Sequence, residues 1–192
     1  MGVQSSFGFT LGRMEKGRLN KITDVPGVRV GHVTRHEGGI NTGVTAILPH
    51  TGDMFHDKCP AASHVINGFG KSIGLVQVNE LGTIETPLLL TNTLSVGTAA
   101  TALVKYMLER NEDIGRDTGT VNPMVFECND GHLNDIRGLH VTEQNALDAL
   151  ANAADDFEEG AVGAGSGMSC YSLKGGIGSA SRVFELYGNK YT

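Results

Sequence analysis

Three carboxylates and two carboxamides fall within nine residues of this chain, from Glu127 to Asp135. They follow a short apolar run, residues 123–128, that is typical of a β-strand. Polar side chains at a strand end are well placed to form a site in layered α/β folds. A carboxylate near the end of the strand, here Glu127, could bind a cationic group of a substrate. The alternative is a plain turn, because residues 129–131 are Asn, Asp and Gly, which are common turn residues.

A second unusual stretch is rich in glycine. Seven of the 23 residues from 160 to 182 are glycine. Glycine loses much backbone entropy on folding, so such a cluster favours tight turns or a close approach of backbone to a ligand or another strand. Five large apolar residues are interspersed, which a flexible linker rarely carries: Val162, Met168, Tyr171, Leu173 and Ile177. The stretch is therefore predicted to be ordered backbone packed near a site.

Common nucleotide-binding and hydrolase motifs do not fit this sequence. Residues 70–72, Gly-Lys-Ser, resemble the end of a P-loop, but Val65 stands where that motif needs its first glycine. Met168 and Ser181 occupy the third-glycine positions of possible dinucleotide fingerprints. Neither Gly-Ser step of the glycine-rich stretch forms the G-x-S-x-G elbow of the hydrolases.

No metal or other cofactor is expected. The seven histidines form no H-E-x-x-H pattern, and His50 and His56 have no acidic partners at ligand spacing in the sequence. Cys59, Cys128 and Cys170 are far apart and form no C-x-x-C pair. The cysteines therefore indicate neither a zinc site nor a disulfide framework.

Length and composition are typical of one globular domain in the cytoplasm. The chain has 192 residues, 40% of them hydrophobic and 19% charged. No apolar run approaches the length of a membrane span, and the N-terminus has no signal-peptide core. Gly2 and Ser6 fit the loose myristoylation pattern, to which we give little weight. The net charge of −6 argues against nucleic-acid binding.

The hydrophobic pattern predicts a mixture of strands and helices. Strands are expected at residues 28–33 and 43–49, pairing as a hairpin, and at 73–78, 86–91, 123–128, 181–187 and 188–192. One helix is expected from residue 96 to about 110, capped by Thr93 or Ser95, and a second after Thr142, which can cap it. Such a mixture predicts an α/β or α+β layered fold.

Five segments, in the right order, resemble the DmpA/BapA-type aminopeptidases, which comprise the L-aminopeptidase/D-esterase and β-peptidyl aminopeptidase family. The resemblance runs from about residue 20 to the last residue. The segments are Ile-Thr-Asp-Val-Pro-Gly-Val-Arg-Val-Gly-His at 22–32, Gly-Val-Thr-Ala-Ile-Leu-Pro at 43–49, Leu-Thr-Asn-Thr-Leu-Ser-Val-Gly at 90–97, Glu-x-Asn-Asp-Gly-x-Leu-Asn-Asp-Ile at 127–136, and Lys-Gly-Gly-Ile-Gly-Ser-Ala-Ser-Arg at 174–182.

The resemblance implies an αββα sandwich like that of the N-terminal nucleophile hydrolases. It implies a precursor that cuts itself into two chains, so that a new N-terminal Ser or Thr attacks substrate amides with its own α-amine as base. The substrate would be a small peptide, amide or ester with a free amino terminus. No metal is needed, and a homo-oligomer is expected.

Four site residues are carried over from the family. Glu127 would be the carboxylate that faces the free amine of the substrate. Asn129 would stand where some members have a pocket tyrosine. Asn67 and Gly68 match a turn near the cleft.

The nucleophile of the family lies beyond the position that matches Thr192, so no catalytic residue is expected in this chain. The expectation is a single domain over residues 1–192 that forms the amino-terminal part of the precursor and contacts its nucleophile-bearing C-terminal part. Two alternatives stay open: a non-catalytic binding or assembly subunit with the same scaffold, and a hydrolase of pantetheine-type amides.

Overall fold

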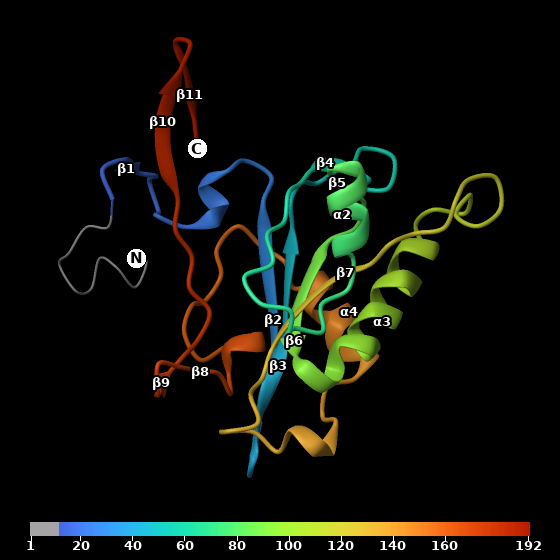
Figure 1. Ribbon diagram of the computed structural model, residues 1–192, viewed down its shortest axis with the longest axis vertical. Helices are drawn as coiled ribbons and strands as arrows, with labels where there is room; N and C mark the ends of the chain where they lie inside the picture. Colours follow the sequence, from blue (N-terminus) through green and yellow to red (C-terminus); the bar gives the residue numbers. More distant parts are fainter. Residues whose placement is uncertain (1–11) are drawn as a thin grey trace.

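The computed structural model describes residues 12–192, and its centre is a four-stranded mixed β-sheet (Figure 1). The strands, in their spatial order, are β2 (Arg29–Glu37), β3 (Ile40–Leu48), β6 (Leu88–Asn92) and β7 (Met124–Cys128). β6 and β7 are parallel, and the other neighbouring pairs are antiparallel. The predicted mixed α/β fold is confirmed. The myristoylation pattern at Gly2 and Ser6 lies outside the described residues.

The first two strands form the predicted hairpin. Their register runs from Arg29 opposite Leu48 to Glu37 opposite Ile40. Both strands extend beyond their predicted bounds into the residues between 33 and 43, because Gly38 has a φ of +56° and permits a tight turn. The turn that precedes β2 contains Pro26 and Gly27, and Gly27 has the positive φ, +88°, that a type II turn requires.

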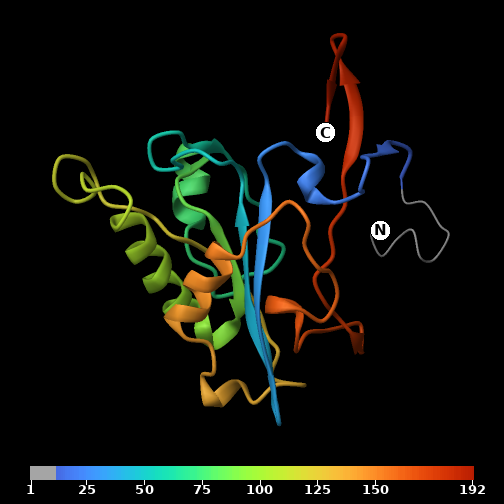
Figure 2. The same ribbon diagram turned by 180° about the vertical axis from the view of Figure 1, so that it is seen from behind.

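Two helices cover one face of the sheet (Figure 2). α3 (Val96–Leu108) and α4 (Glu143–Ala151) lie where the sequence predicts helices. Thr142 caps α4 as expected, but the turn before α3 is capped by Asn92, whose side-chain oxygen accepts from the Ser95 N–H at 3.0 Å. Ser95 occupies the predicted N-cap position of α3, but its side chain makes no capping hydrogen bond, and Thr93 begins a short 3₁₀ turn, Thr93–Ser95, that precedes the helix.

The main core lies between these helices and the sheet. It is formed by buried side chains of β3, β6, β7, α3 and α4. Those with no exposed surface are Val44, Ala46, Leu89, Ala99, Ala102, Leu103, Val125, Ala146 and Ala149. α4 approaches β2 so closely that a Cβ atom at Gly31 would lie 2.2 Å from the Ala149 carbonyl oxygen. The small residues of α4 permit this contact.

A smaller cluster packs around α2 (Leu75–Leu81), at the side of β7. It includes the two-stranded ladder of β4 (Cys59–Pro60) and β5 (Thr83–Ile84). The buried members of the cluster are Met54, Val78, Ile84 and Met124. They anchor the helix over the amino end of β7.

The predicted strand at residues 73–78 is wrong, because α2 occupies most of it. Ile73 makes a single bridge to β7, and Gly74, with a φ of +100°, then turns the chain out of the extended conformation. The helix buries Val78 and leaves Val76 79% exposed. Packing of one helical face thus overrides the apolar, β-branched composition that favoured a strand.

The glycine-rich stretch is ordered and packed against the sheet, as predicted. Its elements are a 3₁₀ turn (Gly163–Gly165), β8 (Ser169–Cys170) and β9 (Leu173–Lys174). Gly160 and Ile177 bridge the two halves of the stretch by backbone hydrogen bonds of 2.8 and 2.7 Å. Gly163 has a φ of +52°, and a Cβ atom there would lie 2.4 Å from Thr45 Oγ1. Only glycine both tolerates this positive φ and has no Cβ atom to collide with Thr45.

The last two predicted strands are present as β10 (Arg182–Leu186) and β11 (Asn189–Tyr191). They form a hairpin that projects from the body, and β1 (Glu15–Lys16) pairs with its base (Figure 1). The turn consists of Tyr187 and Gly188, both with positive φ, which suits a two-residue hairpin. Within residues 12–192, the helices are all too short or too polar to cross a membrane.

Candidate functional site

Glu127 lies near the carboxyl end of β7, beside Thr91 of the parallel strand β6. Both carboxylate oxygens are held by neighbouring groups. The Lys71 N–H donates to Oε1 at 3.1 Å, and the Thr93 hydroxyl donates to Oε2. These donors come from two different connections, one entering α2 and one entering α3, so the carboxylate position depends on the fold of both.

A pocket of about 300 Å³ borders Glu127. Its floor comes from β6 and β7 and its wall from the glycine-rich stretch. The lining residues are Leu90, Thr91, Phe126, Glu127, Cys128, Ala164, Gly165, Met168, Ser169, Cys170, Gly175, Gly176 and Ile177. The lining is mainly apolar apart from the carboxylate. The sequence-based prediction that the glycine-rich stretch lies at a site is consistent with this geometry.

Two cysteines line this pocket, but Cys128 is poorly suited to act as a nucleophile. Burial raises the pKa of the Cys128 thiol, and the adjacent Glu127 carboxylate raises it further. Thiolates rather than thiols attack substrates, so a raised pKa keeps Cys128 unreactive at neutral pH. Both Cys128 and Cys170 are free.

Lys174 holds the glycine wall in place. Its ammonium donates to the Gly165 carbonyl at 3.0 Å and to the Gly175 carbonyl at 2.5 Å. Burial lowers the pKa of Lys174. Because Gly165 and Gly175 both line the pocket, this lysine joins the two segments that define the width of the pocket.

A buried polar network supports the strand ends beneath the pocket. Asp130 is 1% exposed and accepts hydrogen bonds from Thr42 Oγ1 at 2.6 Å and Asn134 Nδ2 at 3.0 Å. Asn92 donates through Nδ2 to Thr42 Oγ1 at 2.9 Å. Asp130 is thus a structural acceptor. The sequence drew attention to the Asp130 region but not to Thr42 or Asn92. For Asn92 the available signal was its place directly after an apolar strand.

The structure separates the other predicted site residues from the pocket lining. Asn129 is exposed, and its Oδ1 accepts from the Gly131 N–H at 2.8 Å, so the turn interpretation describes its geometry. Asn67 is also exposed, and its Oδ1 accepts from the Phe69 N–H at 3.1 Å. Asn129, Asn67 and Gly68 are not among the residues that line the pocket. The binding roles of all four carried-over residues stay predictions.

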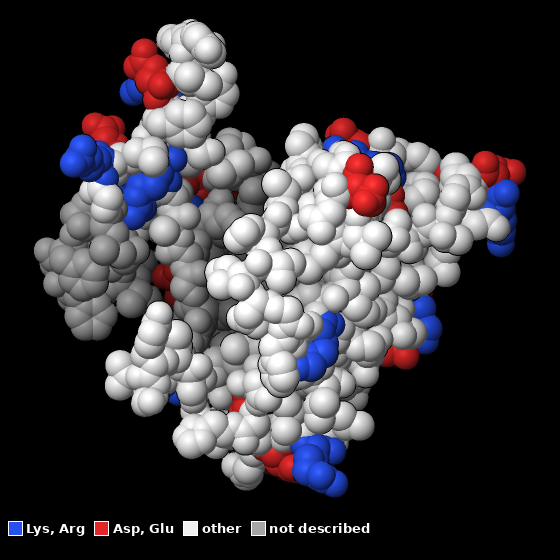
Figure 3. All heavy atoms as spheres, viewed as in Figure 1, with Lys and Arg blue, Asp and Glu red and all other residues white. Residues whose placement is uncertain are grey.

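The loop that contains Asn67 and Gly68 nevertheless reaches the site. A Cβ atom at Gly70 would lie 3.6 Å from Glu127 Oε1. The same loop exposes Ile66 to 90% and Phe69 to 80%. Figure 3 shows this face of the molecule, where many charged side chains lie at the margins and a Lys or Arg group lies among uncharged residues near the middle.

Comparison with known proteins identifies relatives over nearly the whole chain. The sequence profile of Peptidase family S58 matches residues 20–192. Beta-peptidyl aminopeptidase BapA of Sphingosinicella microcystinivorans is 40% identical over 186 residues, which cover 92% of this chain and 46% of the relative. The chain thus spans about half the length of the curated relatives that it matches.

Solved structures share the fold. A crystal structure of a protein from Pyrococcus horikoshii superposes with a TM-score of 0.95 at 55% identity, covering 99% of this chain and 56% of that chain. The L-aminopeptidase D-Ala-esterase/amidase of Ochrobactrum anthropi superposes with a TM-score of 0.87 at 36% identity, covering 97% and 54%. That enzyme is described as a new variant among the Ntn hydrolase fold, which confirms the predicted fold class. This chain belongs to Peptidase family S58.

Proposed function

We propose that this chain forms the amine-binding pocket of a serine-type aminopeptidase that releases N-terminal residues from peptides, amides or esters. The observation that carries the proposal is a carboxylate, Glu127, at the edge of an apolar pocket in a chain of Peptidase family S58. The names of the relatives, beta-peptidyl aminopeptidase and L-aminopeptidase, support the same reaction.

Glu127 has free capacity to bind an ammonium group. A carboxylate offers about four lone-pair sites, and here Lys71 N–H and Thr93 Oγ1 occupy one on each oxygen. An ammonium hydrogen-bonded to the remaining sites would form a charge-assisted contact, which is stronger than a neutral one. The apolar lining would accept the side chain of the residue that carries the amine.

The proposed nucleophile is an N-terminal Ser or Thr that autoproteolysis exposes in residues following Thr192. Its α-amine would serve as the base. The nucleophile-bearing part would cover the sheet face opposite α3 and α4. A neighbouring pocket of about 270 Å³ on that face, lined in part by Ile47, Leu90 and Ile177, supports this placement. We also infer a homo-oligomer in the cytoplasm, where the three free cysteines would stay reduced.

The test is Glu127→Gln in the natively purified protein. We expect kcat/KM for alanine p-nitroanilide to fall roughly 10- to 100-fold, because the neutral amide loses the charged contact but keeps the shape. Hydrolysis of the N-acetylated substrate, which has no ammonium, should stay at its low level in both proteins. The matched control is Glu112→Gln, at an exposed site outside the pocket. Unchanged kcat/KM in Glu127→Gln would refute the role of Glu127.

Intact-mass measurement with N-terminal sequencing tests the nucleophile separately. A second chain that begins with Ser or Thr supports the self-processing hydrolase. A single unprocessed species without hydrolase activity would contradict it and favour the non-catalytic subunit.

A further inference from the structure

A second pocket, of about 310 Å³, lies at the opposite end of the central sheet from Glu127. It is bordered by the start of β2, the end of β3, the residue before β6 and the C-terminal turn of α3. The lining residues are Arg29, Leu48, His50, Thr51, Gly52, Asp53, Met54, Pro87, Tyr106, Met107, Arg110 and Asn111. Pro87 precedes the first residue of β6, whereas Glu127 lies beside Thr91 near its last, so the length of a strand separates the two pockets.

Arg29 is a partly buried cation without a partner in the described residues. Its Nε is inaccessible to solvent, and no acceptor lies within hydrogen-bond distance among residues 12–192. Its side chain forms no ion pair in that part of the chain either. A buried donor that lacks both water and an acceptor is costly, and more so when it carries charge. An unsatisfied guanidinium Nε–H in a pocket wall therefore points to an anion that would accept from it.

Arg110 supplies a second guanidinium to the same pocket. It stacks 3.5 Å from the centroid of the Tyr106 ring, and Nη1 donates to the Tyr106 carbonyl at 3.1 Å. These contacts fix the plane of the guanidinium and leave other N–H groups for a ligand. Planar arginine forks match the two oxygens of a carboxylate.

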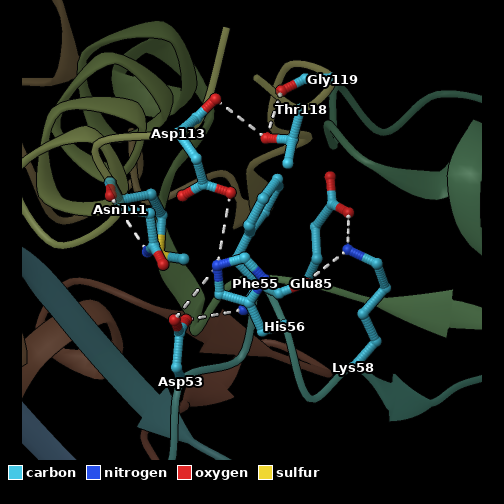
Figure 4. A network of polar contacts seen from close by, with 10 residues as sticks. Asp53, Phe55, His56, Lys58, Glu85, Asn111, Asp113, Thr118 and Gly119 are labelled. Carbon is cyan, nitrogen blue, oxygen red and sulfur yellow. Dashed lines mark hydrogen bonds and ion pairs between the residues drawn. The ribbon is translucent and has the colours of Figure 1, made fainter. Parts of the chain in front are cut away.

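The remaining titratable groups of the pocket are engaged elsewhere. His50 Nδ1 accepts from the Gly52 N–H at 3.0 Å, and Nε2 lies 2.9 Å from the Asp57 carbonyl, which fits a neutral ring with its proton on Nε2. Asp53 accepts from the Phe55 N–H at 3.0 Å and lies 3.8 Å from His56. Figure 4 shows this carboxylate turned toward His56. The pocket lining thus contains two guanidinium groups and one carboxylate, Asp53, and that carboxylate already has partners.

His56 has two acidic neighbours in the fold. It lies 3.4 Å from Asp113 as well as near Asp53, although the sequence showed no acidic partner for it at ligand spacing (Figure 4). This arrangement ties the loop after β3 to the loop after α3. Both loops border the pocket, so these contacts hold two sides of the pocket in place relative to each other.

We propose that this pocket binds a small organic carboxylate, with Arg29 and Arg110 holding the two carboxylate oxygens. The apolar part of the ligand would contact the apolar lining residues Leu48, Met54 and Pro87. An inorganic phosphate has no apolar part and would make no contact with these apolar side chains. The site is independent of the Glu127 pocket and of the proposed peptidase activity.

The test is calorimetric titration of the natively purified protein with sodium 4-methylpentanoate. The alcohol 4-methylpentan-1-ol, which has the same carbon skeleton without charge, and inorganic phosphate are the comparison ligands. We expect saturable binding of the carboxylate and none of the alcohol. Arg29→Met and Arg110→Met should each weaken binding about tenfold or more, the cost of losing a hydrogen bond to a charged group. The control Arg137→Met removes the same charge at an exposed site outside the pocket and should bind normally.

Thermal melts establish that each variant is folded, and Arg110→Met decides the outcome if Arg29→Met does not fold. The proposal would be overturned by no carboxylate binding, by equal binding of the alcohol, or by binding that both arginine substitutions leave unchanged. Tighter binding of phosphate than of the carboxylate would also overturn it. Loss of peptidase activity bears on none of these outcomes.

Discussion

Thr93 donates its hydroxyl hydrogen to Glu127 across the ends of the two parallel strands, β6 and β7. Thr93 begins the turn that leads from β6 into α3, and Glu127 is the fourth residue of β7. The contact therefore couples the carboxylate of the pocket to the start of the helix that carries much of the core.

If the proposed function is correct, Thr93→Val should lower kcat/KM for substrates with a free amine about 3- to 10-fold. The reason is the loss of one hydrogen bond that fixes the carboxylate, a change of about 1 kcal/mol. Thr93→Ser keeps the hydroxyl and should retain most of the activity. Steady-state kinetics on an aminoacyl p-nitroanilide measures the effect. Equal activity of the Val and Ser variants would mean that Thr93 does not position Glu127.

Asp130→Ala should destabilise the protein by about 1–3 kcal/mol, because the buried Thr42 hydroxyl and Asn134 amide lose their acceptor. Urea denaturation measures the free energy of unfolding. Asp117→Ala, at an exposed position, serves as the control and should change it little. A double-mutant cycle with Thr42→Val should show coupling between the two sites. Strict additivity in that cycle would count against the network.

Glu85 should contribute stability that is lost in acid. Burial alone would raise the pKa of this carboxyl, but hydrogen bonds from Lys58 and Asn122 outweigh it and hold the pKa below the ordinary value of 4.5. Figure 4 shows the contact between Lys58 and Glu85. A carboxyl with a depressed pKa in the folded state stabilises above its unfolded pKa, and that contribution fades as the pH falls through the folded pKa.

The measurement is the difference in unfolding free energy between the natural protein and Glu85→Gln at several pH values. The difference should be largest near neutral pH and should shrink as the pH falls below about 4.5, the ordinary carboxyl value. A difference that stays constant from neutral pH to strong acid would show that ionisation of Glu85 does not contribute.

Gly163→Ala should cost more stability than Gly38→Ala, although both glycines have similar φ values of +52° and +56°. A Cβ atom at Gly163 would meet Thr45 Oγ1 at 2.4 Å, whereas one at Gly38 would have no neighbour within 4 Å. The backbone strain of about 1 kcal/mol is common to both, so the difference reports the close contact with β3. Chemical denaturation of the two variants measures it, and equal losses would argue against tight packing there.

Local patterns in the sequence predicted most of the main elements. The alternation at residues 28–33 and the apolar face at 96–108 were sufficient, because these signals arise from the same burial that forms the core. The strand predicted at residues 73–78 was wrong, because a short apolar run is compatible with a strand or a helix. Only the packing of α2 on its neighbours selects the helix. The exposure of Val76 could not be predicted before the neighbours of α2 were known.

Less of the candidate site could be predicted from the sequence. Glu127 could be singled out as a candidate because it lies near the end of an apolar strand, which is a local signal. Its donors Lys71 and Thr93 are 56 and 34 positions away, and no local pattern connects them. The pairing of Arg29 with Arg110 in one pocket likewise depends on the fold of α3 against the sheet.

The ladder between β1 and β10 joins Lys16 to Arg182, near opposite ends of the described chain. Bringing such distant segments together costs much loop-closure entropy, and only two residues of β1 pair to repay it. This ladder should therefore form late in folding, after the central sheet has shortened the path between its strands. Its amides should exchange with solvent deuterium long before those of β3 and β6, and limited proteolysis should release this segment first.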